Sequence, residues 1–356
     1  MTRSDADALT IAVDAMGGDH APAPEVEGAV AAVRERIAKV VLVGDETRLG
    51  QELARHDAGG LDGLTVRHAS EVIRMEDHPA VAAKGKKDSS MRVAFDLAKE
   101  RAVDAVVSAG NSGAMLACGL FVMRRLPGVE RPGIVTTFPT VNGVCALIDM
   151  GANVECRPET LAQFAVLGAV YARLLHGKAR PRVGLLSNGE EAIKGTELTR
   201  GAYKLLSAPD VDKDFEFVGY VEGRDIFSGD VDVVVTDGFT GNVVLKTSEG
   251  AAAAINAIIK REILATTMGK LGALFLRGTF KRLKRVLDVD EHGGAPLVGV
   301  DGIAVLTHGA ASARAIKNGI RVAASFGDAS LPQAIAQAIA KHARLWSEEA
   351  VQAQSG

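Results

Sequence analysis

The sequence predicts an α/β fold in which a mostly parallel sheet carries helices on both faces. Short runs rich in β-branched residues recur along the chain, at residues 9–14, 39–44, 64–68, 104–108, 182–187 and 231–236. Longer segments with apolar residues at three- and four-residue spacing follow some of these runs, at 89–101, 159–176 and 192–206. Only 4% of residues are aromatic, whereas Ala, Val and Gly are abundant. This rhythm and composition are typical of helices packed closely on a parallel sheet.

Residues 133–150 break the pattern, because two β-rich runs follow one another without a helix between them. Asn142-Gly143 lies at their junction and favours a hairpin, which would extend the sheet with an antiparallel pair. No repeat or low-complexity linker is present. We therefore expect one catalytic unit of two closely packed lobes over residues 10–350, preceded by a disordered polar lead-in at residues 1–9.

Composition limits the class of protein. The chain has 356 residues, and 47% of them are hydrophobic, enough for a sizeable core. The scarcity of aromatic residues argues against nucleic acid as a partner. Cys118, Cys145 and Cys156 form no CxxC pair, which fits a reducing compartment. No apolar run reaches the roughly 18 residues of a membrane span, and we expect a soluble or peripheral protein.

The segment after the first predicted strand contains polar groups suited to chemistry. Ligands of open α/β sheets bind beyond the carboxyl ends of the strands. Asp14 ends the first run, Gly17 and Gly18 permit close approach of the backbone to a ligand, and His20 follows as a possible acid or base. A purely structural turn is the competing interpretation.

Three further loops repeat this combination of small and polar residues. The first contains Asn111, Ser112 and Gly113 before an apolar helix, and its free N–H groups predict an anion site. Asn188 lies in the second loop, and Asp237 and Asn242 lie in the third. Helix capping would explain any one of these loops alone. Together they predict one polar cleft.

Cations near these loops are candidates for binding the anion. Lys86 and Lys87 precede a predicted helix, and Lys194 follows Asn188 by six positions. Each is equally compatible with a solvated surface. Asp14, Asp19 and His20 also suggest a hard-cation site, but no further oxygen ligands are evident, and we expect no metal and no cofactor.

Common catalytic motifs are missing from the sequence. No GxGxxG follows the first strand, no P-loop ending in GK[ST] is present, and no GxSxG elbow supplies a nucleophile. A covalent acyl-enzyme intermediate is therefore not expected.

Residues 255–288 form a basic amphipathic segment that we expect to project as a pair of helices. Between residues 260 and 285 there are eight Lys or Arg residues against one acid, although the net charge of the chain is −3. The expected contacts with an anionic membrane or an acidic partner protein are Lys270, Leu274, Phe275, Leu276, Arg277 and Lys281. A dimer-packing helix with solvated lysines is the alternative.

Six blocks carry a resemblance to a known family. They are IAVDAMGGDHAP from Ile11, SAGNSGA from Ser108, LIDMGAN from Leu147, LLSNGEE from Leu185, DGFTGNVVLK from Asp237 and HGGAPLVGVDG from His292. The chain resembles the bacterial phosphate acyltransferases, also called acyl-ACP:phosphate transacylases, over nearly its whole length. The resemblance implies a fold similar to isopropylmalate dehydrogenase and phosphotransacetylase, in a homodimer.

The resemblance also implies an activity. A fatty acyl group would pass from acyl carrier protein to inorganic phosphate, giving an acyl phosphate for glycerol-3-phosphate acylation in phospholipid synthesis. The enzyme would be cytoplasmic, at the inner face of the cell membrane, near the downstream glycerol-3-phosphate acyltransferase. The alternatives are an NAD-dependent decarboxylating dehydrogenase of the same fold, tested by an NAD-linked absorbance change, and a non-catalytic membrane adaptor.

The expected roles of the site residues follow from their chemistry. Asp14, the backbone of both glycine-rich loops, Lys86 and Lys87 would hold phosphate, and Lys194 would add charge. Asn188 and Asn242 would donate hydrogen bonds to the thioester oxygen, and His20 would protonate the leaving sulfur or orient phosphate. Asp237 would orient other polar groups.

Overall fold

The structure is a computed structural model that describes residues 9–208, 213–280 and 294–347. Within these residues one 11-stranded sheet has the order β3-β2-β1-β4-β11-β10-β5-β6-β9-β7-β8. The strands are β1 (Thr10–Asp14), β2 (Lys39–Gly44), β3 (Leu64–His68), β4 (Ala105–Ser108), β5 (Gly133–Thr140), β6 (Gly143–Ile148), β7 (Arg182–Leu186), β8 (Glu216–Val221), β9 (Val233–Val235), β10 (Ala295–Val298) and β11 (Ala304–Leu306).

The strands of the sheet reverse direction at its centre. Strands β1 to β4 and β11 are parallel, and β10 is antiparallel to both β11 and β5. Because β5 and β6 are also antiparallel, β6 runs opposite to β1, and β9, β7 and β8 are parallel to β6. The sheet therefore consists of two parallel halves of opposite direction, one for each lobe.

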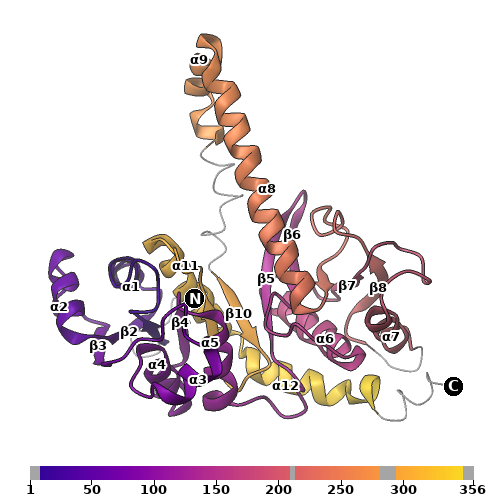
Figure 1. The fold of residues 1–356 in the computed structure, drawn as a ribbon, viewed down its shortest axis with the longest axis horizontal. Helices are drawn as coiled ribbons and strands as arrows, with labels where there is room; N and C mark the ends of the chain where they lie inside the picture. The colour runs from indigo at the N-terminus through magenta and orange to yellow at the C-terminus, as the bar shows by residue number, and fades with distance from the viewer. Residues whose placement is uncertain (1–8, 209–212, 281–293, 348–356) are drawn as a thin grey trace.

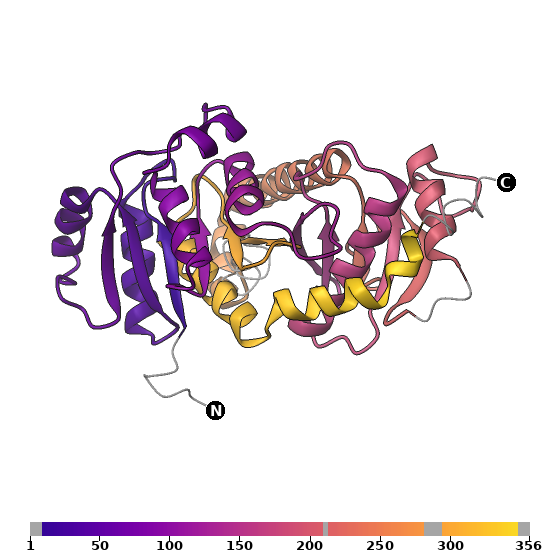
Figure 2. The ribbon, with the colours of Figure 1, turned by 90° about the horizontal axis from the view of Figure 1, so that it is seen from below.

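Helices cover both faces of the sheet, as Figures 1 and 2 show. One face packs against α1 (Ala23–Arg34), α2 (Glu46–Arg55), α6 (Pro158–Leu175), α7 (Glu197–Leu206), α11 (Ala313–Asp328) and α12 (Leu331–Lys341). The other face packs against α3 (Pro79–Gly85), α4 (Ser90–Lys99), α5 (Ser112–Cys118) and the π turn Gly119–Met123. Alternation within β1 illustrates this, since Ile11 and Val13 face the first layer and Ala12 the second.

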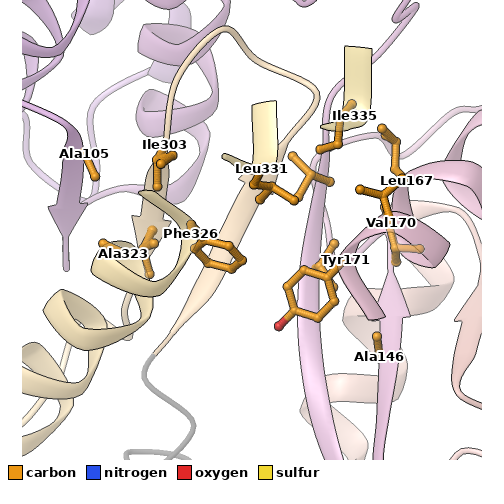
Figure 3. Close-up of a cluster of buried hydrophobic side chains, with 14 of the residues drawn as sticks. Ala105, Ala146, Leu167, Val170, Tyr171, Ile303, Ala323, Phe326, Leu331 and Ile335 are labelled. Carbon is orange, nitrogen blue, oxygen red and sulfur yellow. The ribbon is translucent and has the colours of Figure 1, made fainter. Parts of the chain in front are cut away.

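A continuous core joins the two lobes (Figure 3). The ring of Phe326, on α11, lies 5.9 Å from the ring of Tyr171, on α6. Leu331 and Ile335 on α12 are buried in the same cluster. Helix α11 packs on α1 and β4 of the first lobe and α12 packs on α6 of the second, where Figure 2 shows α12 (yellow) running from the centre of the molecule, so these C-terminal helices hold the lobes together.

The long helix α8 (Gly238–Ala265) projects away from the body with α9 (Thr267–Phe275) at its tip (Figure 1). The predicted projecting helical pair is present, but its first helix begins at Gly238 rather than at the predicted residue 255. Within α8 only Gly238 and Gly241 are buried, and α9 contains no buried residue. Residues 281–288 of the predicted segment, including Lys281, lie outside the described residues, as does most of the lead-in at residues 1–9.

Most of the predicted elements are present. The bounds of β2 and β3 agree with the expected runs, and β5 and β6 form the predicted hairpin. The helix expected over residues 192–206 begins only at Glu197, because Thr196 and Thr199 cap its start reciprocally. Strands β8, β10 and β11 were not predicted. Among the described helices, none combines the length and the apolar character needed to cross a bilayer.

Candidate functional site

The loops after β1 and β4 meet through a buried carboxyl group. Asp14 and Ser108 are paired in register at the ends of these parallel strands. Ser108 Oγ donates to Asp14 Oδ2 at 2.7 Å and accepts from the N–H of Gly110 at 3.0 Å. Burial raises the pKa of Asp14, and its hydrogen bonds oppose that effect. Asp14 thus acts as the anchor that holds the two loops together.

Gly17 lies where these loops pack closely together. A Cβ at this position would lie 2.5 Å from Asp14 Oδ2 and 2.9 Å from the Cα of Gly110. Such distances exclude any side chain, so the backbones of the two loops approach one another directly. The sequence correctly predicted that Asp14, Gly17 and the 108–113 loop lie together.

Asn111 has a structural role in this arrangement. Its Oδ1 accepts from the N–H of Ala114 at 3.0 Å and caps α5, and its Nδ2 donates to the carbonyl of Met75 at 3.0 Å. The same amide is within 3.4 Å of the carbonyls of Arg74 and Asp77. Asn111 therefore holds segment 74–77 against the start of α5, where Ser112 is exposed and Gly113 packs on Pro79.

Lys86 is not placed as a free phosphate ligand. Its ammonium group donates to Asp77 Oδ2 at 2.5 Å and to the carbonyl of Val72 at 2.9 Å. The hydrogen bond from Lys86 lowers the pKa of Asp77. Lys87 is exposed, and Lys84 lies 4.5 Å from the ring centre of Phe121. The paired Lys86 therefore stabilises this segment. Lys87, which is exposed, is the better placed of the two predicted cations to bind an anion.

A third loop, which the sequence did not single out, completes this part of the site. The N–H of Asp19 donates to the carbonyl of Gly309, in the loop after β11, at 2.8 Å. Gly18 lies between Gly309 and Glu25, and His20 is exposed on the outer side of the turn. Glu25 is buried on α1 and was not predicted as a site residue.

The second lobe contains a separate cluster around Asp149. This buried carboxylate accepts hydrogen bonds from the N–H groups of Ile134 at 2.9 Å and Asn153 at 2.7 Å. A Cβ on Gly241 would lie 1.9 Å from the carbonyl oxygen of Asp149. The LIDMGAN and DGFTGN blocks thus pack on each other and seat the first turn of α8 on the end of β6.

The predicted catalytic residues of this lobe have different surroundings. Asp237 caps α8, because its two oxygens accept from the N–H and hydroxyl of Thr240, each at 2.8 Å. Asn188 Oδ1 accepts from the N–H of Gly195 at 3.0 Å and closes its loop. Asn242 and Lys194 are exposed. Asp237 therefore has a structural role, whereas Asn188, Lys194 and Asn242 present polar atoms at the surface.

The two clusters follow strands of opposite direction. The prediction of one polar cleft assumed that β1, β4, β7 and β9 all end at the same edge of the sheet. They do not, because the sheet reverses between β11 and β6. The loops after β1 and β4 therefore lie at one edge of the sheet, and the loops after β7 and β9 lie at the opposite edge.

Three comparisons identify relatives of the chain. Residues 9–334 match the family model described as "Fatty acid synthesis protein". A phosphate acyltransferase from Trichlorobacter lovleyi is 51% identical over 94% of this chain and 95% of its own length, and one from Syntrophotalea carbinolica is 54% identical over 88% and 89%. A phosphotransacetylase structure from Streptococcus pyogenes, 16% identical, covers 89% of this chain and 93% of its own with a TM-score of 0.60.

These comparisons confirm the two main expectations from the sequence. The similarity to the solved structure confirms the expected phosphotransacetylase-like fold. The identity to the curated relatives extends over almost the whole length of both chains. The chain therefore belongs to the phosphate acyltransferase family and is an acyltransferase.

Proposed function

We propose that this protein transfers a fatty acyl group from acyl carrier protein to inorganic phosphate and releases an acyl phosphate. Family membership carries this proposal, because an acyltransferase that uses phosphate needs an anion site and a thioester site. The glycine-rich loops after β1 and β4 meet at Gly17 and Gly110 and would form the wall of the anion site, with the N–H of Gly110 already bonded to Ser108 Oγ. The product would serve glycerol-3-phosphate acylation by a downstream acyltransferase.

The cysteines support direct attack by phosphate on the thioester carbon. Burial raises the pKa of Cys118, Cys145 and Cys156 to about 12. At neutral pH only about one thiol in 10⁵ would then be ionised, too few for a useful nucleophile. Phosphate is already an anion, so the enzyme needs mainly to position it and to stabilise the charge that develops on the carbonyl oxygen.

The remaining roles fall to exposed polar groups. The backbone of Gly17, Gly18, Ser112 and Gly113, with Lys87, would hold phosphate. His20 would protonate the leaving sulfur. Asn188 and Asn242 would donate to the carbonyl oxygen of the thioester, supported by the charge of Lys194; because they follow strands of the other lobe, this role requires the loops of both lobes to reach the same substrate. Asp14, Lys86, Asn111 and Asp237 would act indirectly, by fixing the loops.

A radiochemical assay tests the reaction. Acyl carrier protein bearing a fatty acyl group is incubated with the enzyme and labelled phosphate, and the product is treated with hydroxylamine. We expect a labelled product that hydroxylamine destroys, and loss of the acyl donor only when phosphate is present. Donor loss that does not depend on phosphate would refute the proposal.

We propose two uses for the projecting arm, α8 and α9. Ile255, Ile258 and Ile259 form an exposed stripe at helical spacing on α8, which suits the seam of a homodimer. At the tip, Leu274 and Phe275 are 64% and 82% exposed beside the exposed cations Lys270 and Arg277. This tip would bind anionic lipid at the inner face of the cell membrane and leave the body in the cytoplasm.

Membrane binding is tested by Leu274→Glu/Phe275→Glu. Apolar burial and cation attraction act together, and each Lys or Arg near the surface contributes about 1 kcal/mol. We expect the wild-type protein to float with anionic liposomes and the double variant to remain at the bottom of the gradient with its acyltransferase activity intact. The control Val141→Glu changes a side chain that is 81% exposed on the β5–β6 turn, far from the arm in sequence, and should still float. Flotation of the double variant, or none for wild type, would contradict the proposal.

A further inference from the structure

Glu25 is an unusual residue in the wall of the β1 loop. It lies in the first turn of α1 and is only 1% exposed. Its Oε1 is 2.3 Å from the position that a Cβ of Gly18 would take, and its Oε2 is buried with no hydrogen-bond partner. A buried carboxylate with an unpaired oxygen is costly, so the neutral acid is favoured here.

The neighbouring Asp14 is also buried, but both of its carboxyl oxygens accept hydrogen bonds. It accepts from the hydroxyl of Ser108 at 2.7 Å and from the N–H of Met16 at 3.3 Å. Burial raises the pKa of Asp14 as well, but both of its oxygens accept hydrogen bonds from these donors, whereas Oε2 of Glu25 has no donor. Of the two buried carboxyl groups beside the glycine turn, Glu25 is therefore the one whose ionised form would have an oxygen without a donor.

We infer that Glu25 is a positioning residue for phosphate, and that the Gly17–Gly18 turn accepts the anion when Glu25 is protonated and rejects it when Glu25 is ionised. This inference rests on the proposed function. An ionised Glu25 engages Gly18 and repels a second anion, whereas a proton from solvent bound to the carboxyl group removes both effects.

The electrostatic surroundings support this role at physiological pH. The pKa of Glu25 is raised to about 7, chiefly by burial and also by the charges of Asp14 and Asp19, while hydrogen bonds from its own amide and from that of Gly18 oppose the rise. The other ionisable groups on the elements around Glu25 are His20 on its loop, Arg48 on α2, Glu27 on α1, and His308 and Arg314 near the start of α11. The experiment therefore compares proteins that differ only at Glu25 or Glu27, so that the contribution of these neighbours is the same in each.

Glu25→Gln tests the inference, with Glu27→Gln as the matched control on the exposed side of the same helix. Sulfate is the probe, because it remains a dianion throughout the range used. Its affinity and its proton uptake are measured by calorimetry in buffers of different ionisation enthalpy. Between pH 6.5 and 8.5, we expect sulfate affinity of wild type and of Glu27→Gln to fall by about twentyfold more than that of Glu25→Gln. We also expect uptake of up to about one proton in the first two proteins and less in Glu25→Gln.

The other outcomes have clear meanings. Equal pH dependence and equal proton uptake in all three proteins, or no sulfate binding by wild type, would overturn the role of Glu25. If Glu25→Gln does not fold, Glu25→Met removes the same ionisation with an apolar side chain and carries the same expectation. A purely structural role would change the melting temperature without changing proton uptake. The labelled-phosphate assay on the same wild-type preparation tests the proposed function separately, because the sulfate measurement needs no acyl donor.

Discussion

Gly17→Ala is expected to lower kcat/KM for phosphate by about 100-fold or more. The new Cβ would lie 2.5 Å from Asp14 Oδ2 and 2.9 Å from the Cα of Gly110, and the second contact is with backbone. The loops after β1 and β4 would have to separate, and a displacement of about 1 Å at a reacting site can reduce a rate by about 100-fold. Steady-state kinetics with phosphate as the varied substrate measure this effect.

Gly50→Ala is the matched control for this change. Gly50 lies on the exposed side of α2, and nothing lies within 4 Å of the position of its Cβ. Alanine there should leave the kinetics unchanged and stabilise the helix by up to about 1 kcal/mol. Wild-type phosphate kinetics in a folded Gly17→Ala variant would show that the contact between these loops does not form the anion site.

Gly241→Ala is expected to lower the free energy of unfolding by about 3 kcal/mol or more. Its Cβ would lie 1.9 Å from the carbonyl oxygen and 3.0 Å from the carbonyl carbon of Asp149, so α8 would have to lift away from β6. Overpacking of this kind usually costs about 1–3 kcal/mol, and here the obstacle is backbone, which cannot change rotamer. Urea denaturation followed by circular dichroism measures the change.

The control for this variant lies on the same helix. Gly250 has no atom within 4 Å of its Cβ position, and Gly250→Ala should be as stable as wild type or slightly more stable. If Gly241→Ala and Gly250→Ala unfold at the same urea concentration, then α8 is not seated on the end of β6 as described.

Much of the fold is predictable from local pattern. The runs at β2 and β3 are bounded by charged and glycine residues, and the Asn142-Gly143 turn defines the β5–β6 hairpin. Strands β10 and β11 have only four and three residues, too few for a clear sequence pattern, and they form through pairing with β5 and β4. Because β10 is antiparallel to both β11 and β5, the net reversal of strand direction occurs at the β5–β6 hairpin, which the sequence predicts; what it did not show is how β10 and β11 place that hairpin at the centre of the sheet.

The candidate site was predictable only in part, because the sequence does not show which polar side chains are used for capping or are buried. Parallel pairing places Asp14 beside Ser108, and the sequence pattern is sufficient to expect that. Asn111 and Asp237 were expected near ligands, but capping satisfies their side chains first. Glu25 was missed because an acid in the first turn of a helix is common on the surface. Its burial could have been inferred from helical spacing, because Gly28, Ala29 and Ala32, at three, four and seven positions beyond it, lie on the same side of the helix and are buried.

Intact-protein mass spectrometry during a single turnover tests the central claim most directly. Enzyme in excess over acylated carrier protein is mixed with phosphate and quenched with acid at successive times. Direct attack by phosphate predicts that acyl phosphate appears as the donor disappears, while the mass of the enzyme stays unchanged at every time. An enzyme species heavier by one acyl group, formed and consumed as fast as the product appears, would contradict the account.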